Sequence, residues 1–274
     1  MIDLPDVTLV CVDTRTPERA LQAIAQSTAG LRFAQVLLFT ERLRLTAAAP
    51  AEVKLVELTL DSVAAYSQFM LRGLLRHIGT SHLLVVQWDG YVLDPTCWEA
   101  DFLSYDYIGA LFRDHAGPHS VGNGGFSLRS RRLLQALHDP AMVISHPEDS
   151  CICQVNRQRL QAQHGIYFAP PEVAARFAFE RVAPTGPTFG FHGLFNFHRV
   201  MAPDQLRLWL MDLPQAMAVG LDGHDLCRAL IRAGQLDAAS LLLDKRWRHG
   251  LRDRRTWRLG VQLALSRWRQ RLTS

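Results

Sequence analysis

The sequence lacks the features of several classes of protein. None of its apolar stretches approaches the roughly 18 residues that a membrane span needs, and residues 1–6 have neither the basic nor the apolar segment of a secretory signal. Its five cysteines are odd in number and fit no zinc-ligand spacing. We therefore expect a cytoplasmic protein with reduced thiols.

Acidic residues are scarce at the C-terminal end. Residues 245–274 contain ten Lys or Arg and one acidic residue, which gives this segment a net charge of +9. Because the whole chain has a net charge of +4, residues 1–244 carry −5. Trp247, Trp257 and Trp268 are interleaved with the arginines. Such a tail is typical of segments that bind an anionic membrane, here the inner face of the cytoplasmic membrane. A solvated basic helix is the alternative. Nucleic-acid binding is disfavoured, because the acidic main part offers no supporting basic face.

Apolar runs alternate with helix-like segments through the first 200 residues. The runs that predict strands are 7–12, 35–39, 53–58, 82–87 and 107–112. The segments that predict helices are 17–29, 62–78, 98–103, 131–138 and 148–163. This alternation predicts an α/β fold, a mostly parallel sheet flanked by helices. Residues 201–274 show helical patterns only and predict a helical C-terminal region.

The apolar run 83–86 ends at Gln87-Trp88-Asp89-Gly90. Ligands of open α/β sheets bind outside the carboxyl ends of the strands, so Asp89 is placed to hold a metal ion or a substrate hydroxyl. Gly90 would let a ligand approach the backbone. Because Asp-Gly is also a common turn pair, a plain turn at the end of the strand is the alternative.

A glycine-rich segment, Gly122-Asn123-Gly124-Gly125, follows later in the chain. It is neither a Walker loop nor a dinucleotide-binding fingerprint. A backbone with so little side-chain cover can present N–H groups to a sugar or a phosphate. A tight turn between two strands is the alternative.

Two further segments bring candidate polar groups. Glu148 and Asp149 follow Pro147 at a predicted helix start; a carboxylate fixed there could act as a general base, although helix capping also favours acids. His192 lies in Phe189-Gly190-Phe191-His192-Gly193. It could bind a metal ion or a diphosphate, or it could be a buried structural histidine.

These segments, in this order, resemble the GT-A class of nucleotide-sugar glycosyltransferases. They are similar, more specifically, to a bacterial family of uncharacterised GT-A-like proteins with Trp-Asp-Gly, Gly-Asn-Gly-Gly-Phe-Ser, Pro-Glu-Asp and Phe-Gly-Phe-His-Gly segments. The resemblance covers roughly residues 5–200. It implies a GT-A-like domain over residues 1–200 and a helical appendage over 201–274. It also implies sugar transfer from a nucleoside diphosphate sugar to a hydroxyl of a glycan or lipid-linked glycan, with inversion, in surface polysaccharide synthesis.

The resemblance also implies roles for individual residues. Asp149 would be the catalytic base and Glu148 the second candidate. A divalent metal ion, manganese or magnesium, would be held by Asp89 and His192. The implied donor-binding residues are Thr14, Arg15, Tyr66, Gln87, Trp88, Asp89, Gly124 and Gly125. Enzymes of this class usually carry an Asp-x-Asp triplet at this strand end, and the triplet here is Gln87-Trp88-Asp89. An amide is a poorer metal ligand than a carboxylate, so the resemblance leaves metal dependence open.

Two other functions remain open at this point. A sugar nucleotidyltransferase would carry a glycine-rich loop with an arginine after the first strand, where residues 13–17 read Asp-Thr-Arg-Thr-Pro instead. A non-catalytic nucleotide-sugar or glycan-binding scaffold is favoured by the changed triplet. The acidic pair Glu148-Asp149 and His192 oppose that second alternative.

Overall fold

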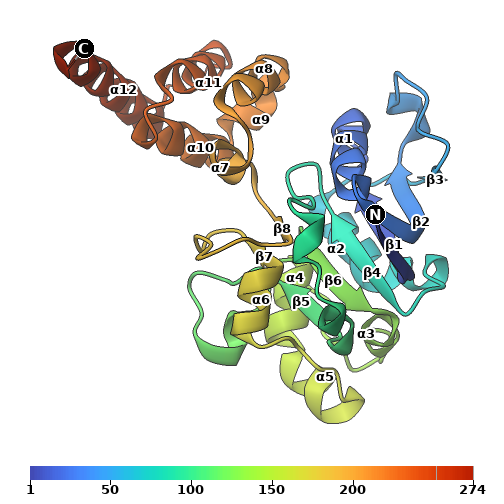
Figure 1. Cartoon of the computed structure of the whole chain (residues 1–274). Helices are drawn as coiled ribbons and strands as arrows, with labels where there is room; N and C mark the ends of the chain where they lie inside the picture. The colour runs from blue at the N-terminus through green and yellow to red at the C-terminus, as the bar shows by residue number, and fades with distance from the viewer. Residues whose placement is uncertain (251, 274) are drawn as a thin grey trace. The chain divides into compact units, whose positions relative to one another are not determined.

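The computed structural model describes residues 1–250 and 252–273 (Figure 1). The chain divides into two compact units, Met1–His192 and Gly193–Ser274. The first unit contains a layered α/β fold and the second contains helices. In the described residues, no helix is both long enough and apolar enough to cross a membrane.

A six-stranded sheet forms the centre of the first unit. Its strands are β1 (Ile2–Val12), β2 (Leu31–Thr40), β3 (Val53–Glu57), β4 (His82–Val86), β5 (Tyr107–Gly109) and β6 (Ser127–Ser130). They lie in the order β3-β2-β1-β4-β6-β5. The first four strands in this order are parallel, and β6 is antiparallel to both β4 and β5. The mostly parallel sheet that the sequence predicts is therefore confirmed.

Six helices and a second, two-stranded sheet complete this unit. The helices are α1 (Pro17–Thr28), α2 (Val63–Gln68), α3 (Arg131–Ala136), α4 (Glu148–Ser150), α5 (Arg157–His164) and α6 (Pro171–Phe177). The small sheet pairs β7 (Ala178–Phe179) with β8 (Gly190–Phe191) in parallel. This pairing brings the residues that follow the two strands close to one another.

Three helices are less regular than the sequence predicts. A π-helical turn, Phe69–Gly73, and a 3-10 turn, Leu74–His77, continue α2, and a π-helical turn, Cys151–Val155, continues α4. The helix expected over residues 98–103 is replaced by short 3-10 turns. Apolar spacing alone does not distinguish these forms, because they differ only in which carbonyl accepts each hydrogen bond.

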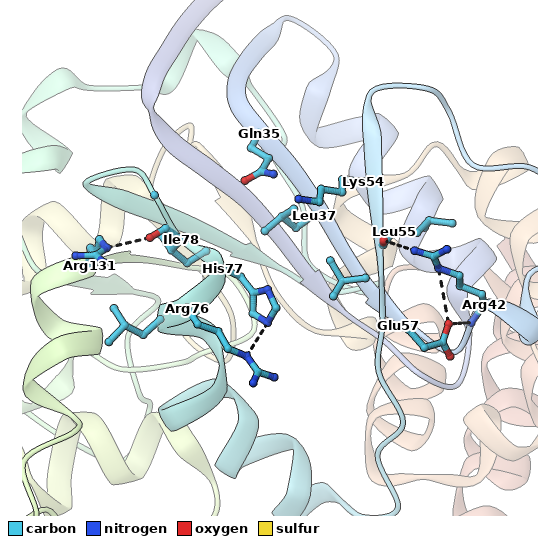
Figure 2. A pocket seen from close by; sticks show the side chains of 13 residues that line it. Gln35, Leu37, Arg42, Lys54, Leu55, Glu57, Arg76, His77, Ile78 and Arg131 are labelled. Carbon is cyan, nitrogen blue, oxygen red and sulfur yellow. Dashed lines mark hydrogen bonds and ion pairs between the residues drawn. The ribbon is translucent and has the colours of Figure 1, made fainter.

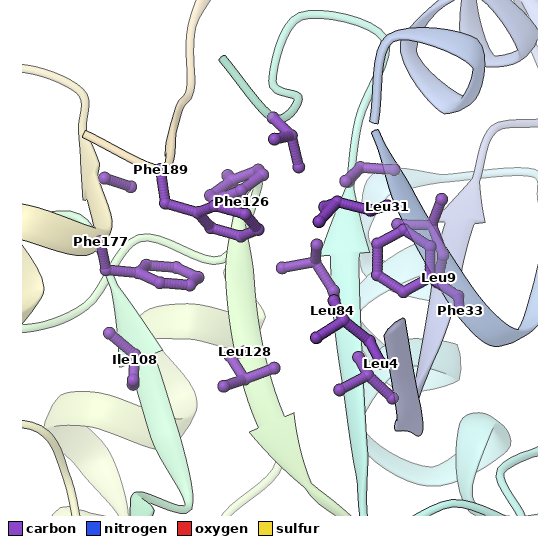
Figure 3. Close-up of a cluster of buried hydrophobic side chains, with 14 of the residues drawn as sticks. Leu4, Leu9, Leu31, Phe33, Leu84, Ile108, Phe126, Leu128, Phe177 and Phe189 are labelled. Carbon is purple, nitrogen blue, oxygen red and sulfur yellow. The ribbon is translucent and has the colours of Figure 1, made fainter. Parts of the chain in front are cut away.

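The sheet is buried on both faces. Leu84 and Val86 of β4 face one hydrophobic cluster, in which the rings of Phe126, Phe177 and Phe189 contact one another (Figure 3). Leu83 and Val85 face a second cluster, with residues from the segments α2 and α3. This two-sided burial explains why β4 is apolar from Leu83 to Val86 instead of alternating.

Two strands differ in length from the prediction. β1 begins at Ile2, before the predicted start, and its register with β2 shifts between Leu4 and Thr8. Pro5 lies within this shift, where the N–H that proline lacks is not needed for the ladder. β5 ends early at Gly109, and the carbonyl of Gly122 lies where a Cβ atom of residue 109 would be.

The second unit is helical, as the sequence predicts. Its helices are α7 (Phe197–Val200), α8 (Pro203–Asp212), α9 (Gln215–Val219), α10 (Leu221–Arg232), α11 (Leu236–Arg248) and α12 (Arg254–Thr273). Arg246 of α11 is buried, and its Nη1 donates hydrogen bonds to the carbonyls of Ala218 at 2.5 Å and Gly220 at 3.1 Å. Part of the basic tail is therefore used inside the fold.

Candidate functional site

The segment after β4 is a tight turn. Gln87 N donates to Gly90 O, and Gly90 N donates to Gln87 O, both at 3.0 Å. The turn expected as the plain alternative is therefore present, and it holds Asp89 at its tip in a buried position. Trp88, the other tip residue, is partly exposed.

The end of β1 lies at the same edge of the sheet. β1 and β4 are parallel neighbours, with Cys11 opposite Val86. Thr14 and Arg15, which come after β1, therefore lie at the same edge of the sheet as the turn that comes after β4. The carboxylate of Asp13 accepts hydrogen bonds from the N–H groups of Arg15 and Thr16, each at 2.7 Å. Thr14 is buried and Arg15 is exposed.

His192 connects the predicted donor-binding residues. Its Nε2 donates to Gln87 Oε1 at 3.1 Å and lies 3.5 Å from Asp89 Oδ1. Gln87 Nε2 in turn donates to the hydroxyl of Tyr66 at 2.8 Å. The structure thus brings together Tyr66, Gln87, Asp89 and His192, which come from three separate parts of the sequence.

The charges around His192 favour its protonated form. Glu180, which follows β7, places Oε1 3.8 Å from His192 Nδ1. Burial lowers the pKa of His192, but the carboxylates of Asp89 and Glu180 outweigh burial and raise that pKa well above its usual value. Burial, followed by the charge of Glu148, raises the pKa of Tyr66, which therefore remains a neutral phenol.

The glycine-rich segment packs directly against these groups. A Cβ atom on Gly125 would overlap the imidazole of His192, and one on Gly124 would overlap Oε1 of Glu148. The N–H of Gly124 donates to Asp149 Oδ2 at 3.2 Å. These glycines are therefore needed for close packing, and the Gly124 N–H is engaged within the chain.

The two neighbouring acids lie in different surroundings. Glu148 is buried, and its Oε1 pairs with Nη2 of the fully buried Arg129 at 3.1 Å. Asp149 is partly exposed, with Oδ1 accepting from Ser150 N at 2.7 Å and Oδ2 from Gly124. The backbone therefore orients Asp149 while leaving it accessible.

The sequence analysis missed two residues that contact the candidate site, Arg129 and Glu180. Arg129 donates to the carbonyl of Gly124 at 3.2 Å and to Ser127 Oγ at 3.0 Å, besides its pair with Glu148. β6 reads Ser-Leu-Arg-Ser, so Arg129 stands in a mostly polar sequence, and no local signal pointed to its burial. Glu180 had no signal, because only the pairing of β7 with β8 brings it to His192.

The predicted metal ligands, Asp89 and His192, do lie close to one another. In the described residues, however, no group of three or more His, Cys, Asp or Glu could hold a metal ion. A metal ion that bridges a diphosphate needs few protein ligands, because the phosphates and waters complete its shell. The imidazole must also lose its extra proton before it binds a metal. The two residues fit a divalent ion only together with such a ligand.

A cavity of about 670 Å³ lies beside the edge strand β3 (Figure 2). Its lining includes Arg42, Lys54, Arg76, His77 and Arg131, with Glu57. Glu57 pairs with Arg42 at 3.7 Å, and Arg76 Nε donates to His77 Nε2 at 3.1 Å. None of the predicted site residues lines this basic cavity.

The comparisons with known proteins identify a family. A family model described as "Protein of unknown function (DUF5672)" matches residues 51–192, just over half of the chain. The chain belongs to this family. The part of this DUF5672 protein that matches contains every predicted site residue except Thr14 and Arg15.

Among the solved structures that align with this DUF5672 protein, one covers much of the chain. It is the crystal structure of a glycosyltransferase involved in the glycosylation of the major capsid of PBCV-1, with 11% sequence identity and a TM-score of 0.42. The alignment covers 68% of this chain and 91% of that one. No curated protein sequence matches the chain. At this level of similarity, the alignment assigns no activity.

Proposed function

We propose that this DUF5672 protein is a glycosyltransferase that moves a sugar from a nucleoside diphosphate sugar to a hydroxyl of a glycan or lipid-linked glycan. The observation that carries the proposal is the convergence of Asp89, His192 and the oriented Asp149 around Gly124 and Gly125. Ligands of open α/β sheets bind at this edge of the sheet. The site therefore has a place for the donor and a carboxylate near it.

Asp149 acts as the general base in this proposal. Its Oδ1 and Oδ2 accept backbone hydrogen bonds, so the carboxylate is oriented before the acceptor arrives. The acceptor hydroxyl gives its proton to Asp149 while its oxygen attacks the anomeric carbon. The bond from that carbon to the diphosphate breaks on the opposite side, and the diphosphate leaves with the bonding electrons. One such displacement inverts the anomeric configuration.

Glu148 has a positioning role. Its pair with Arg129 is fully buried, and Arg129 also binds the carbonyl of Gly124. The pair therefore fixes the glycine-rich segment against the start of α4, and with it the N–H that holds Asp149. Removing one partner of such a pair leaves an uncompensated buried charge.

Asp89 and His192 are the residues that would hold a divalent ion. Such an ion would neutralise negative charge on the departing diphosphate. Gln87 links His192 to Tyr66 and so orients the imidazole toward Asp89. Thr14 and Arg15 are proposed to contact the nucleotide at the end of β1.

A non-catalytic nucleotide-sugar-binding module is the second candidate. The observation that favours it is Gln87, because both atoms of its amide are used within the chain, by His192 and Tyr66. Surface polysaccharide synthesis at the inner face of the cytoplasmic membrane is the setting we propose for either candidate. Turnover of a bound donor separates the two.

Donor binding is tested by thermal unfolding with UDP, GDP, dTDP and CMP sugars, each with manganese and with a chelator. A donor at 100 times its dissociation constant adds about 2.7 kcal/mol to the free energy of unfolding. Asp89→Ala is expected to weaken donor binding more with manganese than with the chelator. Equal donor affinity of the parent protein in both conditions would show that the site does not use a metal ion.

The catalytic role is tested by Asp149→Asn. We expect turnover to fall by about 10²–10⁴-fold, the usual contribution of a general base, while donor affinity is unchanged. The matched control is Asp101→Asn, an exposed acid of the same unit, which should leave both quantities unchanged. Full turnover of Asp149→Asn with lost donor affinity would contradict the assignment. Donor binding without turnover by the parent protein would favour the non-catalytic module.

A further inference from the structure

Helix α12 carries an apolar stripe whose five side chains are each more than half exposed. Trp257, Val261, Leu265, Trp268 and Leu272 are all between 51% and 66% exposed. They are spaced by four, four, three and four residues along one continuous helix. At 3.6 residues per turn, this spacing places all five within about 80° of the helix circumference.

The opposite face of α12 packs on its own unit. Thr256, Leu259 and Leu263 are buried, and Gly260 faces the ring of Trp247. The stripe is therefore additional to the face that the fold uses. Apolar residues scattered singly over a surface are normal, but a continuous row of five large ones marks a binding surface.

The charge of α12 is entirely positive. The helix contains no acidic residue, and its basic residues are Arg254, Arg255, Arg258, Arg267, Arg269 and Arg271. By helical spacing, Arg258 and Arg269 lie along one border of the stripe and Arg271 along the other. Arg267 lies away from the stripe and pairs with Asp237 of α11 at 3.4 Å.

We propose that the stripe of α12 docks this chain on an anionic lipid surface, with the helix axis in the plane of the interface. Leucine and valine would enter the boundary between headgroups and acyl chains, and the two tryptophans would lie at headgroup level. The arginines along the borders would extend their side chains toward the anionic headgroups. This surface is independent of the proposed sugar transfer.

A second copy of the chain is a less suitable occupant. The spacing from Val261 to Leu272 would suit a coiled coil, but the flanking positions of a coiled coil need charges of both signs to pair across the interface. Two copies of α12 would bring arginines against arginines. An anionic bilayer, in contrast, supplies the negative charge that would pair with the arginines of α12.

The structure changes which residues form this surface. The sequence analysis singled out Trp247, Trp257 and Trp268 of the basic tail. Trp247 instead belongs to α11, where its ring packs edge-on against Trp257 with 4.7 Å between centroids. Gly250, at a φ of +81°, lies between α11 and α12. Val261, Leu265 and Leu272, which the sequence analysis did not single out, supply most of the stripe.

The test is sedimentation of the full chain with vesicles at low salt. One set is phosphatidylcholine alone, and the other also contains phosphatidylglycerol. The stripe variant is V261Q/L265Q/W268Q, and the matched control is Q262A/S266A, on α12 but outside the stripe. All substituted side chains are at least partly exposed, so the unfolding temperatures should equal that of the parent. Leu272→Gln, near the end of the helix, is a second, milder variant.

We expect the parent and the control to bind the anionic vesicles, and the stripe variant to lose at least about tenfold in partitioning. Leu272→Gln should fall between them. The variant R258Q/R269Q/R271Q should lose the preference for phosphatidylglycerol. The proposal is overturned if the parent does not pellet, or if the stripe variant pellets as the parent does. It is also overturned if, without lipid, the parent is a dimer that the stripe variant converts to a monomer while vesicle binding is unchanged.

Discussion

At the scale of single residues, adjacent side chains of the same type acquire different roles from their surroundings. The carboxylate of Glu148 forms an ion pair with Arg129 in the interior, whereas the carboxylate of Asp149 accepts hydrogen bonds from backbone N–H groups near the surface. The sequence predicted an acidic pair at a helix start, and that placement is confirmed. It could not predict the buried partner of Glu148, because Arg129 reaches it only through the pairing of β6 in the sheet.

Gly125 provides a residue-scale prediction. In Gly125→Ala the new methyl group would overlap the His192 ring, so we expect the free energy of unfolding to fall by about 1–3 kcal/mol. The imidazole signals of His192 in an NMR spectrum should also shift. Gly79→Ala is the matched control, because a Cβ atom there meets nothing within 4 Å. An unchanged His192 signal in Gly125→Ala would contradict this packing.

At the scale of elements, Asp106 connects segments that are distant in sequence. This buried carboxylate accepts hydrogen bonds from Ser130 at the end of β6, from Arg132 of α3 and from the N–H of Tyr167. Burial alone would raise the pKa of Asp106, but these three donors outweigh burial and hold the pKa below its usual value. The ionised form is therefore the one that the fold stabilises.

The expected consequence is a pH-dependent stability. The pKa of Asp106 is lower in the folded protein than in the unfolded chain, so the ionised carboxylate stabilises the fold. This stabilisation is complete above the pKa of the unfolded chain, about 3.9, and is lost as the pH falls through the pKa of the folded protein. Asp106→Asn should lower the free energy of unfolding at neutral pH by about 1–3 kcal/mol. The difference from the parent should shrink in acid. Urea titrations at several pH values measure this, and a constant difference would contradict it.

The sequence predicted the regular elements better than the irregular ones. The strand over residues 82–87 and the helix that begins at Pro17 were predicted almost as observed, because an apolar run and an N-terminal proline are local signals. The π-helical turn after α2 and the early end of β5 were not predicted. The apolar pattern of residues 107–112 continues past Gly109, and the close approach of Gly122 to Gly109 is a contact that no local pattern shows.

At the scale of the whole molecule, each unit has buried apolar residues of its own. Leu230 of α10 is fully buried in the helical unit. Leu230→Ala should therefore cost about 2–5 kcal/mol of stability in that unit. Hydrogen exchange should show lost protection in α10 and α11, with the protection of β1 and β4 retained. Equal loss of protection in the sheet would show that the two units unfold together.

The strand order has a consequence for how the family segment can be used. The family match begins at residue 51, just before β3, yet β3 pairs only with β2, and β1 lies between β2 and β4. A protein cut at residue 51 would keep β3 without a neighbour and would open the side of β4 that β1 covers. Exposed, apolar strand edges pair with other chains. We therefore expect the shared segment to aggregate when expressed alone, and to need the preceding fifty residues in order to fold.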